Sequence, residues 1–390
     1  MKKALRTYNP LNSFIYGIEG AENSVKGREF RTFYLVNFYR YVGAVLVAIA
    51  HYTAYFPLEQ NFRAHLFGAL HPLMGFFFAL SGFVIMHVYG GHITSFAHYG
   101  VYLQKRLARI YPIFIATFMI SCVYAIYTHN HSDMFAPSAI LPNILLIHAW
   151  NTTKMLTFDY PSWSVSAEMF VYLLFPVFLF MVDRMRAFAF ALPFILAAVV
   201  AGVFFVFGLG NWVDATFNGG CLMATPSFVS GMIVQRLLTR NLASFRAPAW
   251  VAHAMALATV PLALAGVPGS IMLFYMTMLV FVMVAAEPER PGLLSRPFAR
   301  NLANASYGFY LLHIPVADIV LRSLVRRLSF PPAATYALAP VAIIVTTMLA
   351  VASFRYFEDP LRRYLGSPIL RLASKSRIIG DGKHLVKDAL

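Results

Sequence analysis

The sequence predicts an all-α protein, a polytopic transmembrane helical bundle of about ten spans with both termini cytoplasmic. Hydrophobic residues make up 59% of the chain and charged residues 12%, against about 25% charged in an ordinary globular protein. Long apolar runs alternate with short polar segments, and basic residues gather in every second polar segment. This composition excludes a disordered protein, a coiled coil and an ordinary cytosolic enzyme.

Ten apolar runs account for the predicted spans, because each is about long enough to cross a hydrocarbon core of ~30 Å at 1.5 Å per residue. The segment 138–150 is too short to cross, and we expect it to be a re-entrant or interfacial piece of an outer loop. We expect a cytoplasmic N-terminal segment over 1–33, the transmembrane domain over 34–364 and a basic cytoplasmic tail over 365–390. The runs lie at about 34–56, 69–89, 110–128, 162–182, 187–208, 221–237, 248–266, 270–286, 302–325 and 335–356.

The basic residues between the spans set the predicted orientation. With the N-terminus inside, the outer side carries only Arg63, Lys154 and the pair Arg326–Arg327, as the positive-inside rule requires. The net charge of +15 then reflects loops that face anionic lipid, so we expect membrane lipid and not nucleic acid as a partner. The cytoplasmic side carries Lys105, Arg106, Arg109, Arg184, Arg186, Arg236, Arg240, Arg246, Arg290, Arg296 and Arg300.

The first span carries two ionisable residues, Arg40 and His51. Such groups at membrane depth cost about 2.5–3.5 kcal/mol each on insertion scales, so each is a candidate functional residue. Eleven residues make about three turns, which places the two side chains on one helix face, roughly 16 Å apart. The alternative is an arginine that anchors the helix at the surface and a histidine that is hydrogen-bonded in the core.

The fourth span carries a carboxylate, Glu168, about two turns from its outer end and roughly 9 Å below the outer surface. His51 lies at nearly the same predicted depth, so the two side chains could pair. Such a carboxylate would fix the imidazole tautomer and raise its basicity, as a general base needs. Depth alone leaves a purely structural pair between two helices equally open.

Three further groups are candidates by position. Arg106 and Arg109, predicted at the start of the third span, share a helix face and could grip a phosphate, although a basic collar at a span start is common. Ser81 and Gly82, near mid-depth of the second span, indicate close helix packing or room for a slender ligand. His313 lies near the middle of the ninth span, where a hydrogen-bonded core histidine is the default interpretation.

Six sequence motifs together resemble the acyltransferase-3 family of bacterial membrane O-acyltransferases. FYRYVGAVLVAIAHY is similar to that family's Arg-x10-His signature, and the other matches follow in the family's order over residues from about 34 to 364. One departure is Met169, where many members carry a second acidic residue. The other five motifs are FFFALSGFVI, KRLARIYPIF, PSWSVSAEMFVYLLFP, NASYGFYLLHIPV and FRYFEDPLRR.

The resemblance implies a multi-pass enzyme of the cytoplasmic (inner) membrane. It implies transfer of an acyl group, usually acetyl, from cytoplasmic acyl-CoA to a hydroxyl of a glycan or lipid-linked saccharide at the outer side. We expect acetyl-CoA, or another acyl-CoA, as a donor substrate and no permanently bound cofactor. No metal is expected, because none of the His or carboxylate spacings forms a metal-binding set.

The resemblance also assigns expected roles to the candidate residues. His51 would act as general base on the acceptor hydroxyl, or as a transient acyl carrier, and Glu168 would orient it. Arg40, Arg106 and Arg109 would hold the phosphates of CoA. Ser81 and Gly82 would line the channel for the thioester, and the supporting residues would be Trp163, Tyr310 and His313.

Two other classes of function stay open from the sequence. A transporter or flippase for a glycan or lipid-linked saccharide would use the same intramembrane charges as a conduction path. Against it, the sequence contains no inverted repeat and no paired broken helices. A catalytically inactive family member with a scaffolding role is the third possibility. The sequence does not identify the acceptor or distinguish acetyl from longer acyl groups.

Overall fold

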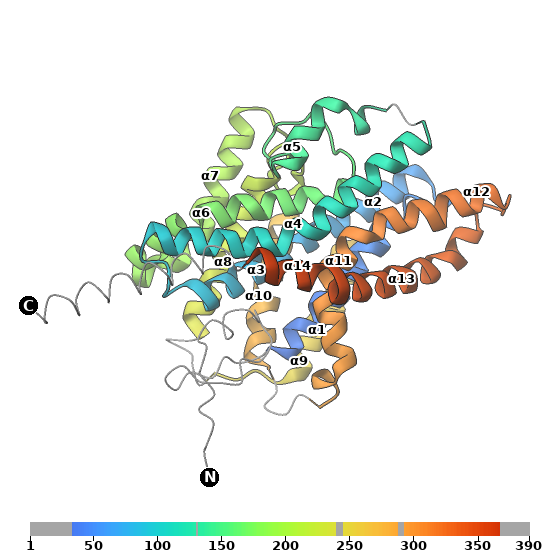
Figure 1. Cartoon of the computed structure of the whole chain (residues 1–390). Helices are drawn as coiled ribbons and strands as arrows, with labels where there is room; N and C mark the ends of the chain where they lie inside the picture. Colours follow the sequence, from blue (N-terminus) through green and yellow to red (C-terminus); the bar gives the residue numbers. More distant parts are fainter. Residues whose placement is uncertain (1–32, 130–131, 239–244, 288–291, 367–390) are drawn as a thin grey trace, which may run out of the picture.

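The structure is a computed structural model that describes residues 33–129, 132–238, 245–287 and 292–366. The described residues form helices joined by loops and contain no strand (Figure 1). The expected N-terminal segment 1–33 and tail 365–390 lie almost entirely outside them. The helices are α1 (Tyr34–Tyr52), α2 (Gln60–Leu70), α3 (Met74–Tyr89), α4 (Phe96–Tyr127), α5 (Ile140–Ile144), α6 (Trp163–Met185), α7 (Leu192–Val206), α8 (Gly220–Arg236), α9 (Ala249–Leu264), α10 (Gly269–Ala285), α11 (Pro297–Ala317), α12 (Val325–Arg327), α13 (Ala334–Ser353) and α14 (Asp359–Leu365).

Each of the ten expected apolar runs overlaps one of these helices. Within the described residues, seven helical segments are long and apolar enough to cross a membrane. The helices α9 and α10 are apolar but shorter, and α8 has 17 residues. The structure therefore confirms an all-helical bundle with several membrane-crossing helices, while the number ten and the position of the termini stay predictions.

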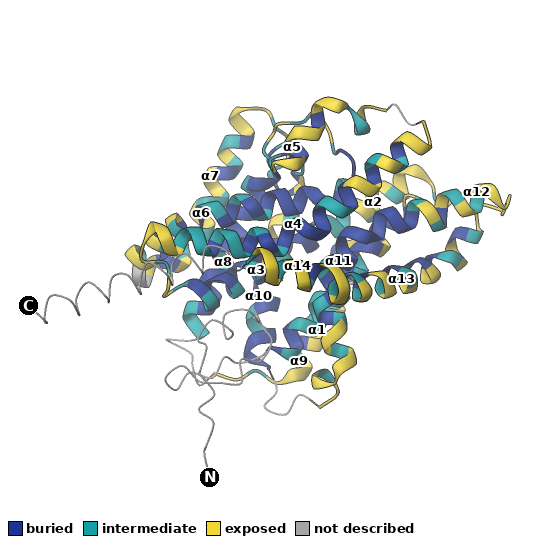
Figure 2. Cartoon of the chain, in the orientation of Figure 1, coloured by how far each residue is buried: buried dark blue, intermediate teal, exposed yellow. Residues whose placement is uncertain are grey.

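The outer surface of the bundle is apolar, as a lipid-facing surface must be. Large apolar side chains on several helices are strongly exposed, among them Phe205 at 86%, Ile126 at 75% and Met348 at 67%. Figure 2 shows exposed residues toward the periphery of the bundle and buried residues in the middle, along α4, α8 and α11. Exposed apolar area of this extent is stable against hydrocarbon but not against water.

Helices α1 and α11 form a parallel pair at the centre of the bundle, and α13 lies along α11 (Figure 1). Because hydrogen bonds between the two segments occur in the same order along both, the segments run in the same direction. The three bonds join Arg40 to Ser306, His51 to His313 and, just beyond the helix ends, Tyr55 to Asp318.

Helices α3 and α8 cross at glycines and make the most extensive helix contact among the described residues. A β-carbon on Gly82 would lie 1.9 Å from the carbonyl oxygen of Phe228, and one on Gly231 would lie 1.8 Å from the carbonyl oxygen of Ala79. Only glycine permits this approach, which is a common way to pack helices in lipid. Gly82 is therefore a packing position, the first of the two interpretations that the sequence allowed.

One element differs from the sequence-based expectation. The third membrane helix, α4, begins at Phe96 and not at 110, because Ser95 caps it by accepting a hydrogen bond from the backbone N–H of His98. Arg106 and Arg109 consequently lie about three turns inside a helix and do not form a collar at its start. The segment 138–150 contains the short helix α5 and does not span, as expected.

Candidate active site

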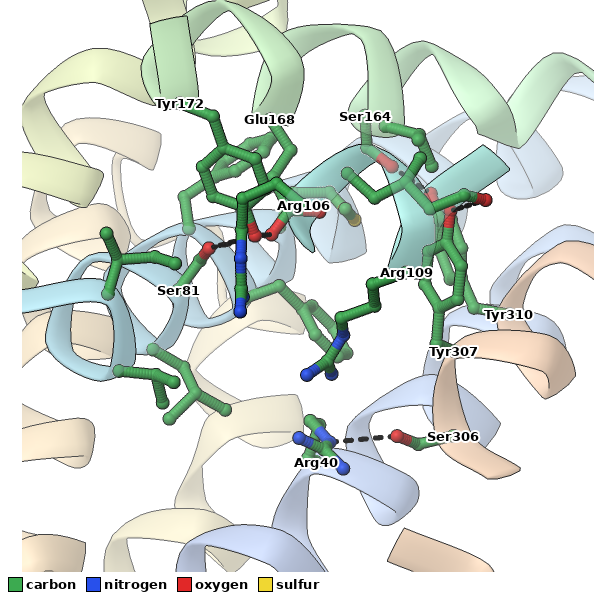
Figure 3. Close-up of a pocket in the computed structure, with 18 residues that line it drawn as sticks. Arg40, Ser81, Arg106, Arg109, Ser164, Glu168, Tyr172, Ser306, Tyr307 and Tyr310 are labelled. Atoms are coloured by element: carbon green, nitrogen blue, oxygen red, sulfur yellow. Dashed lines mark hydrogen bonds between the residues drawn. The ribbon is translucent and has the colours of Figure 1, made fainter. Parts of the chain in front are cut away.

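An internal cavity of about 120 Å³ lies where α1, α3, α4, α6 and α11 converge. Its walls combine apolar side chains with a polar set that includes three guanidinium groups, one carboxylate and several hydroxyls (Figure 3). Six of the residues singled out from the sequence meet here although they come from five different helices. The polar lining residues are Arg40, Ser81, Arg106, Arg109, Ser164, Glu168, Tyr172, Ser306, Tyr307 and Tyr310.

The three arginines direct their guanidinium groups into this shared space (Figure 3). Arg40 donates from Nε to the Ser306 hydroxyl at 2.8 Å and from Nη2 to the Ala303 carbonyl at 2.5 Å, which fixes it against α11. Arg106 donates to the Tyr89 hydroxyl at 3.0 Å and stacks over the same ring at 5.1 Å. Neighbouring side chains thus hold the charges in place before any ligand arrives.

The cavity is lined by more positive than negative charge, and one of its arginines, Arg106, is buried. The Nε of Arg106 is buried without a hydrogen-bond partner, and no hydrogen bond or ion pair in the described part of the chain involves the Arg109 guanidinium. One carboxylate, that of Glu168, faces three cations. A buried charge without a partner is costly, whereas guanidinium groups bind phosphate by forked, charge-assisted hydrogen bonds. The arrangement is suited to a ligand with several negative charges.

Glu168 faces this cavity and does not pair with His51. Its Oε1 accepts hydrogen bonds from the Ser81 hydroxyl at 2.7 Å and from the Tyr172 hydroxyl one turn along α6. The expected His51–Glu168 pair is therefore absent from the described structure. The depth argument compared only positions along the two helices, and the direction in which α6 presents its side chains decides the contact instead.

The partner of His51 is His313, whose Nε2 lies 2.8 Å from the His51 Nδ1 in a buried contact between α1 and α11. The other nitrogen of His313, Nδ1, is hydrogen-bonded to the Tyr310 carbonyl oxygen. A carbonyl only accepts, so Nδ1 carries the proton and the Nε2 of neutral His313 is an acceptor. His51 must then donate from Nδ1, which leaves its Nε2 as an unprotonated base.

Tyr310 connects the cavity with the histidine pair. Its side chain lines the cavity, its ring centre lies 5.7 Å from that of His313, and its hydroxyl is 2.8 Å from the Ser164 hydroxyl. The Tyr160 ring packs against the His51 ring nearly at right angles, with ring centres 5.2 Å apart. The side chain of His313 therefore separates the Tyr310 wall of the cavity from the imidazole of His51.

Four of the expected site residues do not line the cavity: His51 and His313, which form the pair described above, and Gly82 and Trp163. Gly82 packs against α8, as described above, and the Trp163 ring stacks on His71 with ring centres 5.4 Å apart. Trp163 also fills the space over Gly220, where a β-carbon would meet its ring at 2.8 Å. Both positions shape the helices that carry the site.

Several residues at the site were not anticipated from the sequence. Tyr172 follows Glu168 by four residues on the same helix, so helical spacing alone could have identified it. Ser306 and Tyr89, which hold Arg40 and Arg106, carry no such signal, because each contact joins different helices. Only the packing of the bundle brings them together.

Outside the membrane helices, the carboxyl of Asp159 is a buried titratable group next to this region. It is 1% exposed, and neither oxygen has a hydrogen-bond partner within the described residues. Burial raises the pKa of Asp159 to about 8, because a buried carboxylate loses its hydration. Asp159 directly precedes Tyr160 in the chain, so the protonation state of its carboxyl affects the surroundings of the Tyr160 ring that packs against His51.

Comparison with known proteins gives one family and one curated relative. A family model described as "Acyltransferase domain" matches residues 33–355, which include every polar residue of the cavity and both histidines. The acyltransferase MdmB of Streptomyces mycarofaciens is 26% identical over 322 residues, covering 74% of this chain and 80% of the relative. No solved structure matches the chain.

Proposed function

The chain belongs to the acyltransferase-3 family of membrane acyltransferases, and from this premise we propose that it transfers an acyl group, most simply acetyl, from acyl-CoA to a hydroxyl of a glycan or lipid-linked saccharide. The observation that carries the proposal is the relation between two features. A cavity with three guanidinium groups lies next to a histidine whose tautomer leaves a free basic nitrogen. The first suits the phosphates of CoA, and the second suits activation of a hydroxyl.

In this mechanism, Arg40, Arg106 and Arg109 bind the phosphate groups of acyl-CoA. The acyl-pantetheine arm extends from them past Ser81 and along the apolar wall toward Tyr310. Arg40 and His51 are eleven residues apart on α1, roughly 16 Å along the helix axis, so an extended arm is needed to join the two sites. Glu168 is held by Ser81 and Tyr172 on the cavity wall, where it orders the channel and does not act on the imidazole.

The chemical step uses the free nitrogen of His51. Nε2 takes the proton of the acceptor hydroxyl while the hydroxyl oxygen attacks the thioester carbonyl. The carbon–sulfur bond then breaks, and the CoA thiolate recovers the proton from the imidazolium, so the products are an ester and free CoA. His313 is a positioning residue, because it holds the proton on His51 Nδ1 and keeps Nε2 available.

We further propose an orientation with both termini in the cytoplasm and a location in the cytoplasmic membrane. The distribution of basic residues supports it. The arginines of the cavity then lie nearer the cytoplasmic end of α1, where acyl-CoA is available. His51, at the other end of the same helix, lies nearer the outer side, where the acceptor would be.

A transporter or flippase is the alternative, and donor binding separates the two. The proposal predicts saturable binding of acetyl-CoA to the purified protein and incorporation of labelled acetyl into an envelope fraction that contains glycans and lipid-linked saccharides. A transporter has no reason to retain CoA. Glu168→Gln keeps the shape of the channel wall and should retain near-normal turnover if Glu168 only orders the channel. Turnover reduced by several orders of magnitude would instead place its charge in the chemical step.

A further inference from the structure

A second cavity of about 120 Å³ lies on the other side of His51. It is built from the end of α1, the second half of α4, the loop before α6 and the π-helical segment Asp318–Leu324 that continues α11. π-Helical turns are rare and frequently occur at functional sites. The residues that line it with a ring or a polar group are Tyr55, Ser121, Tyr124, Ser132, Phe135, Phe158, Tyr160, Asp318 and Arg322.

The position of this cavity follows from the parallel pair of helices. Along α1 the order is Arg40, His51, Tyr55, and along α11 and its continuation it is Ser306, His313, Asp318, so the two cavities flank the histidine pair. Tyr160 makes the link, because its ring lines the second cavity and also lies against His51 with ring centres 5.2 Å apart. His51 lines neither cavity, but along the helix pair it lies between them, with His313 and Tyr310 toward the first and Tyr160 toward the second.

The polar groups of the second cavity are held in a fixed arrangement. Asp318 Oδ1 accepts a hydrogen bond from the Tyr55 hydroxyl at 3.0 Å and lies 3.2 Å from Arg322 Nη1. The Arg322 guanidinium stacks over the Tyr55 ring at 5.2 Å. Both contacts use the same carboxylate oxygen, and Arg322 is also hydrogen-bonded to the Tyr124 side chain, so Asp318 Oδ2 and the N–H groups of Arg322 beyond these contacts can bond to a ligand.

The charge of this cavity differs from that of the first one. Asp318 and Arg322 cancel each other, whereas the first cavity combines three cations with one carboxylate. Aromatic faces next to a carboxylate and a guanidinium offer apolar contact to the ring of a sugar and both donors and acceptors to its hydroxyl groups. A phosphorylated or carboxylated sugar would carry a negative charge that this cavity, with no net charge, does not balance.

We infer that the cavity between Tyr55, Tyr160, Asp318 and Arg322 binds the hydroxyl-bearing unit of the acceptor, and that this unit is an uncharged saccharide. The inference rests on the proposed acyltransferase function. It adds the site, the residues and the chemical class of the acceptor. The bound hydroxyl reaches His51 past Tyr160, opposite to the side from which the thioester arrives.

The test compares Arg322→Gln and Asp318→Asn with Arg326→Gln, which removes an exposed arginine one turn further on that does not line the cavity. Each variant is assayed with labelled acetyl-CoA and the envelope glycan fraction of the producing cells. We expect the half-saturating amount of the fraction to rise at least about tenfold for the first two variants, as for loss of a charged hydrogen bond. Acetyl-CoA affinity and the Arg326→Gln variant should match the native protein.

The result that overturns the inference is an unchanged half-saturating amount in Arg322→Gln and Asp318→Asn while the native protein is active. Tyr55→Phe, which removes a single oxygen, gives the same comparison if the charge variants fold poorly. Absence of acetyl-CoA binding by the native protein would instead refute the proposed function itself. Octyl glucoside and octyl glucuronide serve as competitors. Inhibition by the neutral compound alone supports the assigned class, and inhibition by the glucuronide, or by neither, overturns it.

Discussion

Replacing Arg109 by glutamine gives the cleanest test of the anion-binding cavity. Its guanidinium points into the cavity, and no hydrogen bond or ion pair within the described residues involves it, so the substitution breaks no such contact inside the protein. Arg40 and Arg106 are less suitable, because each is hydrogen-bonded to a neighbouring helix. A hydrogen bond to a charged group contributes about 1.5–3 kcal/mol. Its loss should weaken acetyl-CoA binding about 10- to 150-fold.

The assay is equilibrium binding of acetyl-CoA to purified protein, repeated with acetyl-pantetheine, which lacks the nucleotide and its phosphates. Arg109→Gln should lose affinity for acetyl-CoA but not for acetyl-pantetheine, and added salt should reduce the difference between the proteins. Arg184→Gln, an exposed position on α6, is the matched control and should behave as native. Equal affinity of native protein and Arg109→Gln for acetyl-CoA would refute the assignment of this cavity to the donor phosphates.

Three further predictions concern positioning, packing and protonation. His313→Ala should lower kcat about 10²- to 10⁴-fold and leave the acetyl-CoA affinity unchanged, so unaltered kcat would remove His313 from the mechanism. Gly82→Ala should destabilise the protein by at least about 1–3 kcal/mol in thermal unfolding, because its methyl group meets the Phe228 carbonyl. The control Gly202→Ala, at a position with open space around it, should not destabilise the protein, and equal melting temperatures of the two variants would disprove the close crossing of α3 and α8. The pKa of Asp159 is raised to about 8, so the folded state binds the proton more tightly than an exposed carboxyl with a pKa of about 4 does. The melting temperature should therefore fall as the pH is raised from 5 to 8, and Asp159→Asn should flatten this dependence. Identical pH profiles of the native protein and the variant would contradict the burial of Asp159.

The sequence predicted the fold class and the main helices, because apolar runs of membrane length leave few other structures. It missed the true start of α4, since the region from Phe96 to Arg109 contains enough polar residues to resemble a loop in a hydropathy pattern. A cap at Ser95 and burial of Arg106 in the protein interior explain why that region is helical.

The sequence predicted which residues form the candidate site better than it predicted the contacts among them. Arg40, Ser81, Arg106, Arg109 and Glu168 were recognised as ionisable or small groups at membrane depth, and they do line one cavity. Their partners could not be predicted, because depth fixes only one of three coordinates. The rotation of each helix about its axis sets the other two, and that rotation depends on packing between helices.

The His51–His313 contact shows this limit most clearly. The sequence placed His51 near the outer end of one span and His313 near the middle of another, and it could not show that α1 and α11 run side by side. The second cavity, around Asp318 and Arg322, was also missed. Its signal was a charged pair four residues apart on one helix, which is far more often a simple surface ion pair.

The most direct test of the proposed function is release of CoA from acetyl-CoA by the purified protein in liposomes, with the envelope glycan fraction as acceptor, compared with His51→Ala. The proposal predicts that the native protein releases CoA and acetylates the fraction. The variant should bind acetyl-CoA with native affinity and show no transfer. A His51→Ala variant that still transfers acetyl groups at the native rate would contradict the central role of His51. A native protein that neither binds acetyl-CoA nor releases CoA would contradict the assignment of acetyl-CoA as the donor.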